Sequence, residues 1–135
     1  MHLREIQKTH DIKKMIVHIG ANHIPDVNPR DLLRDLSQMY KTIRNMFPNT
    51  TIFNSAMIPR KSDEFLYALK IINEEVELYI RTLRIKTISH LQFGTNTINY
   101  NLLKHDKVHP TKAGTILRAR NMIAIYRNYR NSAST

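Results

Sequence analysis

The sequence predicts an α/β domain built on a parallel sheet with helices on its faces. Short, mostly apolar runs typical of buried strands alternate with longer segments whose apolar residues recur at the helical period. Gly or Pro ends most of these runs, and no repeat or linker-like stretch divides the 135 residues. We therefore expect one domain over residues 1–130 and a disordered tail over 131–135.

Three strands are expected in this sheet. The first runs from Met15 to Ile19 and is stopped by Gly20. The second covers residues 50–57, before Pro59, and the third covers residues 87–93, before Gly94. The helices between them imply parallel βαβ crossovers, and such sheets place their working residues just past the carboxyl ends of the strands.

Four helices are expected, the first from a weak pattern over residues 2–13. The second begins with Asn28 as N-cap and Pro29 at the first helical position, and Pro48 ends its pattern. Its apolar positions are Leu32, Leu33, Leu36, Met39, Tyr40, Ile43, Met46 and Phe47.

The two later helices follow the same kind of signal. The third runs from the capping residue Asp63 to about residue 84. The segment 95–109 shows no clear period and is expected to be loop. The last helix covers residues 111 to about 129, with Ile116, Leu117, Ile123 and Ala124 on one face.

Charge is distributed unevenly along the chain. The net charge is +10, of which residues 78–135 carry +9, from ten Lys/Arg and one acidic residue. Such a field favours anionic partners such as nucleic acid, although basic residues also form ordinary solvated faces. Cys is absent, no apolar run is long enough to span a membrane, and no signal peptide is recognisable. These features favour a soluble, intracellular protein without disulfides.

Asp106 and His109 are the first candidates for chemistry. A carboxylate three residues before an imidazole can accept a hydrogen bond from one ring nitrogen, which leaves the other nitrogen able to take a proton. Gly20 and Asn22 follow the first strand, where an Asn amide can stabilise an oxyanion. Each pattern also occurs in ordinary turns, with a capping Asp and a surface His.

In combination these motifs resemble the SGNH (GDSL-type) hydrolases. Residues 16–23, Ile-Val-His-Ile-Gly-Ala-Asn-His, are similar to the family's third block, an apolar strand running into Gly-x-Asn-Asp. Residues 106–110, Asp-Lys-Val-His-Pro, followed by Gly114, are similar to the final Asp-x-x-His block. The resemblance implies a three-layer, flavodoxin-like fold and hydrolysis of carboxylic or acetyl esters by a Ser-His-Asp mechanism without metal or other cofactor.

Carried over by position, the resemblance makes His109 the general base, Asp106 its orienting partner and Asn22 an oxyanion donor, with Gly20 shaping the loop. The Gly-Asp-Ser block and the second block have no counterpart in this sequence, and His23 replaces the Asp of the third block. We therefore expect a chain that lacks the first βαβ unit and is inactive alone, as an incomplete or degenerate esterase.

Two further expectations concern partners. The strand from Met15 to Ile19 would then be an exposed edge, which favours self-association or a partner chain. The alternative function is noncatalytic binding of RNA or another nucleic acid, as in SGNH-like domains that have lost catalytic residues, and esterase-like domains also occur in mobile-element proteins. The candidate contacts for this role are Arg118, Arg120, Tyr126, Arg127, Tyr129 and Arg130. His and Asp residues show no recognised zinc spacing, so no metal is expected.

Overall fold

The computed structural model describes residues 12–19, 29–59, 63–95 and 97–133. Its sheet contains three parallel strands in the order β1-β2-β3, namely β1 (Lys14–His18), β2 (Thr51–Ser55) and β3 (Lys86–Ile88). Ile16 lies beside Phe53, and His18 lies beside Ser55, which lies beside Ile88. The expected parallel α/β sheet is thereby confirmed.

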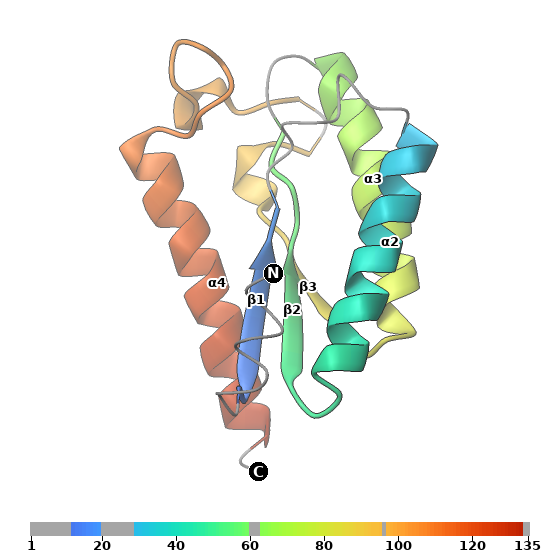
Figure 1. Cartoon of the computed structure of the whole chain (residues 1–135). Helices are drawn as coiled ribbons and strands as arrows, with labels where there is room; N and C mark the ends of the chain where they lie inside the picture. The colour runs from blue at the N-terminus through green and yellow to red at the C-terminus, as the bar shows by residue number, and fades with distance from the viewer. Residues whose placement is uncertain (1–11, 20–28, 60–62, 96, 134–135) are drawn as a thin grey trace.

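Helices cover both faces of this sheet. The helices α2 (Pro29–Met46) and α3 (Asp63–Arg81) lie on one side, and α4 (Lys112–Ala133) lies on the other (Figure 1). The three-layer arrangement expected from the sequence is therefore present. The chain that leads into α4 lies at the end of the molecule where the strands finish (Figure 1).

The main core lies between the sheet and the two helices on its first face. Its apolar period is what the sequence predicts: α2 buries three of the expected positions, Phe47 just after it is a fourth, and α3 buries residues at the same spacing. These core residues are Leu36, Tyr40, Ile43, Phe47, Leu69, Ile72, Val76 and Ile80, packed with Ile52 of β2. Tyr40 also donates a hydrogen bond to Asn54 of β2, which fixes the register of α2 on the sheet.

A buried guanidinium closes the amino-terminal end of the sheet. Arg44 is 8% exposed and donates to the carbonyls of Phe47, Thr50, Leu83 and Arg84. Burial, with a contribution from the charge of Arg84, lowers the pKa of Arg44. This single side chain connects the end of α2, the start of β2 and the turn that follows α3.

Several predicted boundaries are wrong. The helix expected over residues 2–13 falls outside the described residues, except that Ile12 and Lys13 are not helical. α3 ends at Arg81 rather than near Arg84, because Arg84 adopts a left-handed backbone with φ of 60° in the following turn. The second strand ends at Ser55.

The third strand is also shorter than expected. β3 ends at Ile88, and residues 91–93 form a 3-10 turn that buries Phe93 completely. The backbone turns at His90, which sends the imidazole back toward Ser55 of β2. The segment expected to be loop contains a second 3-10 turn, Tyr100–Leu102, whose neighbours Ile98 and Leu103 are buried.

The last helix differs from its prediction in both length and orientation. It continues to Ala133, through part of the expected tail. Ile116 and Ile123, expected on its apolar face, are 44% and 48% exposed. The side turned toward the sheet instead carries Asn121, whose amide binds His90. The hydrogen bond between Asn121 and His90 therefore contributes to the attachment of this helix, beside half-buried Leu117.

Candidate active site

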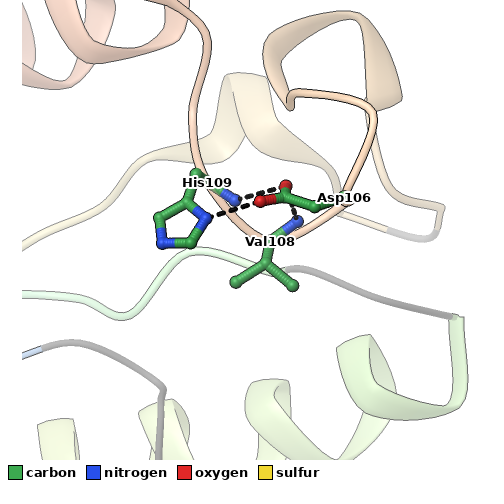
Figure 2. A network of polar contacts seen from close by, with 3 residues as sticks. All are labelled: Asp106, Val108 and His109. Atoms are coloured by element: carbon green, nitrogen blue, oxygen red, sulfur yellow. Dashed lines mark hydrogen bonds and ion pairs between the residues drawn. The ribbon is translucent and has the colours of Figure 1, made fainter.

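Asp106 and His109 lie on one tight turn between the second 3-10 turn and α4. One carboxylate oxygen, Oδ1, accepts hydrogen bonds from the backbone N–H groups of Val108 and His109, at 2.9 and 3.0 Å (Figure 2). The other, Oδ2, is 2.6 Å from His109 Nδ1. Backbone and imidazole thus hold the carboxylate in one orientation, and the predicted dyad is formed.

Backbone hydrogen bonds hold the two ends of this turn together. Leu103 and Pro110 form an antiparallel bridge, and the N–H of Lys104 donates to the carbonyl of His109 at 2.8 Å. Thr111 caps α4, because its hydroxyl accepts the N–H of Gly114 at 3.1 Å. A Cβ at Gly114 would lie 2.5 Å from the carbonyl oxygen of Leu102, so only glycine permits this close approach.

The arrangement leaves His109 able to act as a base. Its Nδ1 donates to the carboxylate, so in the neutral ring Nε2 carries the free lone pair. The side chain of His109 is 70% exposed, which leaves room for a reacting group. The hydrogen bonds from His109, followed by that from Val108, hold the pKa of Asp106 well below its usual value, so the carboxylate stays charged.

The predicted oxyanion residues cannot be placed beside this dyad. Gly20 and Asn22 lie outside the described residues, as do Ser62 and Ser134. The resemblance made Asn22 an oxyanion donor, and that role stays a prediction.

A second polar cluster, which sequence analysis missed, lies on the α4 side of the sheet. Ser55 Oγ is 2.9 Å from His18 Nδ1 and 2.8 Å from His90 Nε2. Asn121 Nδ2 of α4 is 3.1 Å from His90 Nδ1, and its amide pairs with that of Gln92 through two hydrogen bonds. The cluster joins β1, β2, the end of β3 and α4.

The hydrogen bonds that connect Asn121 to His18 in this cluster all run in one direction. With Asn121 donating to His90 Nδ1, the ring must donate from Nε2 to Ser55, whose hydroxyl then donates to His18 Nδ1. Burial lowers the pKa of His90 to about 4, and His18 and Arg118 add to this shift. Burial, followed by the charge of Arg118, also lowers the pKa of His18.

The histidines do not make Ser55 a nucleophile for bound substrate. Ser55 is only 2% exposed, and both of its hydrogen-bonding directions are occupied by the imidazoles. The sequence offered a faint signal for this cluster, since His18 and Ser55 both lie at strand ends. His90 and Asn121 come from elements that only the fold brings together.

The basic residues proposed for nucleic-acid contact all belong to α4. Arg120 and Arg127 are exposed, whereas Arg118 is partly buried. The side chains of Tyr126, Tyr129 and Arg130 lie outside the described part of the structure.

The described residues show neither a metal site nor a membrane-spanning helix. They contain no group of three or more His, Cys, Asp or Glu side chains that could hold a metal ion. Within the same residues, no helix is long and apolar enough to cross a membrane.

The described residues thus form a three-layer α/β fold on a parallel sheet, with an Asp-x-x-His turn ahead of the last helix. No protein-family model matches the sequence, and no curated protein matches it significantly. Three solved structures resemble the fold, and each is from 15% to 23% identical in sequence.

The first is a Streptococcus pneumonia protein provisionally described as a platelet activating factor (TM-score 0.69, 16% identity). The second is the esterase domain of the ORF1 protein from the zebrafish ZfL2-1 retrotransposon (TM-score 0.63, 23% identity). The third is a carbohydrate esterase family 3 protein from Talaromyces cellulolyticus (TM-score 0.69, 15% identity).

These similarities cover 92%, 82% and 96% of this chain, but only 66%, 66% and 64% of the three solved chains. The chain thus spans slightly less than two thirds of their length. The chain shares the fold of these solved structures, two of which are described as esterases, in agreement with the three-layer α/β fold that the sequence resemblance implied.

Proposed function

We propose that this chain supplies the base and its orienting carboxylate, His109 and Asp106, to an SGNH-type ester hydrolase. The observation that carries the proposal is the 2.6 Å contact between His109 Nδ1 and Asp106 Oδ2, on a braced turn with the imidazole exposed. The fold similarity to esterases supports the same reaction class.

In this mechanism His109 Nε2 removes the proton of a serine hydroxyl while the serine oxygen attacks the ester carbonyl carbon. The proton then passes to the departing alcohol. A water molecule, deprotonated by the same nitrogen, attacks the acyl-serine, and that proton returns to the serine oxygen as the carboxylic acid leaves. Asp106 stays charged and stabilises the imidazolium that forms in each step.

We propose that the nucleophilic serine comes from another polypeptide segment. The 135 residues contain no Gly-Asp-Ser, and Ser55 is buried between two histidines. We therefore propose that the chain alone is inactive and is completed by a Ser-bearing segment.

The edge of the sheet at β1 is the proposed docking place for that segment. β1 is an outer strand among those described, and Ile16 is 36% exposed on the face that it shares with His18. On α4, which covers this same face, Ile116 and Ile123 are also exposed. An added strand and helix would bury these apolar side chains and extend the sheet.

The test compares the chain with a fusion that carries a Gly-Asp-Ser strand–helix unit ahead of β1. We expect no hydrolysis of para-nitrophenyl acetate by the chain alone, hydrolysis by the fusion, and loss of that activity on His109→Ala. If the chain alone hydrolyses the ester, and activity disappears with His109→Ala but survives every single Ser→Ala change, the argument about the nucleophile is wrong.

A second candidate function, noncatalytic binding of RNA, is favoured by the exposed Arg120 and Arg127 on α4. Binding of single-stranded RNA should then weaken steeply with salt and should fall when Arg118, Arg120 and Arg127 are changed to Ala. Absence of binding at low salt would exclude this function.

A further inference from the structure

A groove of about 770 Å³ opens on the face of the dyad turn that carries the Asp106 carboxylate. The second 3-10 turn forms one wall, with Tyr100 42% exposed, and the dyad turn forms the other. The titratable side chains of the dyad turn that line it are Lys104, His105, Asp106 and Lys107, all of them exposed.

The positive charges of this groove are not balanced locally. Among the described residues, no carboxylate forms an ion pair with Lys104 or Lys107. The carboxylate of Asp106 is the only acidic group in the lining, and it already accepts three hydrogen bonds from Val108 and His109. With two ammonium groups and one carboxylate, the described lining keeps a net positive charge, and neither ammonium group is held in an ion pair.

An aromatic face lies beside these charges. The Lys107 Nζ atom is 5.4 Å from the centre of the Tyr100 ring, within the range of a cation–π contact. The ammonium and the ring together form a surface that suits an anionic group attached to an apolar or planar body.

The position of this surface relative to His109 is fixed by the turn. Lys107 N–H donates to the carbonyl of Lys104, and Lys104 N–H donates to the carbonyl of His109, both at 2.8 Å. Lys107 and His109 are two residues apart, so their Cα atoms lie within about 7 Å of each other. A molecule held by Lys107 would therefore be bound on the same turn that carries His109, although His109 itself does not line the groove.

We propose that the groove is an anion subsite, and that the ester on which the dyad acts carries a carboxylate or phosphate group a few bonds from the scissile carbonyl. This substrate class rests on the proposed hydrolase function, whereas anion binding in the groove does not. Neutral esters would lack the contacts with Lys104 and Lys107, so they would be poorer ligands.

The test uses the chain as it is, with binding as the readout. Titration with phenyl phosphate, followed by amide chemical shifts in nuclear magnetic resonance, should give saturable changes centred on residues 100–107. Benzyl alcohol, a neutral aromatic, should bind much more weakly, and inorganic phosphate separates the contribution of the anion from that of the ring.

Variants then assign the binding to the two ammonium groups. Lys104→Gln with Lys107→Gln should weaken phenyl phosphate binding about tenfold or more, with each single change giving a smaller loss. The matched control, Lys41→Gln with Lys70→Gln on the exposed faces of α2 and α3, lowers net charge equally and should leave binding unchanged.

Three results would overturn the proposal. They are absence of saturable shifts in the groove, equal weakening in the control variant, and preference for a short oligouridine with shifts along α4 instead of the groove. A different set of results is expected if the hydrolase function is wrong but the groove does bind anions. Phenyl phosphate would still bind with the expected Lys dependence, while the fusion with the Ser-bearing unit would hydrolyse neither phenyl acetate nor para-acetoxybenzoate.

Discussion

Replacing His90 with Gln should remove a large part of the pH dependence of stability. In the folded protein the ring of His90 is 5% exposed, hydrogen-bonded at both nitrogens, and faced by His18 of β1 and Arg118 of α4. These surroundings lower its pKa from 6.5 to about 4. Gln keeps a hydrogen-bonding side chain at this position but cannot take up a proton in this pH range.

The sign and size of this pH dependence follow from the linkage between protonation of His90 and folding. Between pH 6.5 and about 4 the unfolded chain carries a proton on His90 and the folded chain does not, so stability falls as the pH is lowered. Each pH unit costs at most about 1.4 kcal/mol, and the whole window costs about 3 kcal/mol. Below the folded pKa both states are protonated and this contribution becomes constant.

The measurement is urea unfolding followed by circular dichroism at several pH values across that window. At neutral pH, His90→Gln should be less stable than the wild type, since it loses the paired contacts with Ser55 and Asn121. The difference should shrink by about 3 kcal/mol as the pH falls to about 4. His105→Gln, at an exposed histidine, is the matched control and should parallel the wild type.

Parallel stability curves for His90→Gln and the wild type would refute the reasoning. They would mean that His90 accepts a proton in the folded state without cost. The geometry offers one way for this to happen, because rotation of the Asn121 and Gln92 amides by half a turn would present an oxygen to His90 Nδ1.

Three other predictions concern the stability of the fold and the role of the dyad. Arg44→Met should lower the free energy of unfolding by about 2–4 kcal/mol in urea titrations, because four backbone carbonyls lose their donor, whereas Arg34→Met at an exposed position should have little effect. Gly114→Ala should cost about 1–3 kcal/mol in the same assay because its Cβ would collide with the Leu102 carbonyl, and an unchanged urea midpoint would contradict that packing. In the active fusion, Asp106→Asn should lower kcat about 10³–10⁴-fold with little change in KM, and a loss confined to KM would show that the carboxylate does not orient the base.

The parts of the fold that were predictable depend on local periodicity. The apolar spacing of α2 and α3 survives in the structure because each helix buries one continuous face against the same core. The strands β1 and β2 were found within one or two residues of each end, since apolar runs bounded by Gly or Pro leave few alternatives. Boundaries failed at Arg84 and His90, where tertiary hydrogen bonds and turn conformation decide where an element ends.

The pattern of apolar residues in α4 does not predict which face of this helix is turned toward the sheet. A pattern with Ile116 and Ile123 on one face predicts that this face is buried, yet both side chains are exposed. The helix is attached to the sheet through Asn121, whose partner His90 lies 31 residues earlier in the chain. No local pattern encodes such a contact. The contact between Asp106 and His109 could be predicted because the two residues are only three positions apart and lie on one turn.

The two polar clusters are mechanically connected through α4. The dyad turn leads directly into this helix at Thr111, and Gly114 packs against Leu102, so the turn moves with the helix. Asn121 and Gln92 then connect the middle of the helix to His90. Protonation of His90, which requires at least a rotation of the Asn121 amide, therefore acts on the element that positions His109. If the proposed hydrolase function holds, ester hydrolysis by the fusion should also fall at the pH where this connection weakens.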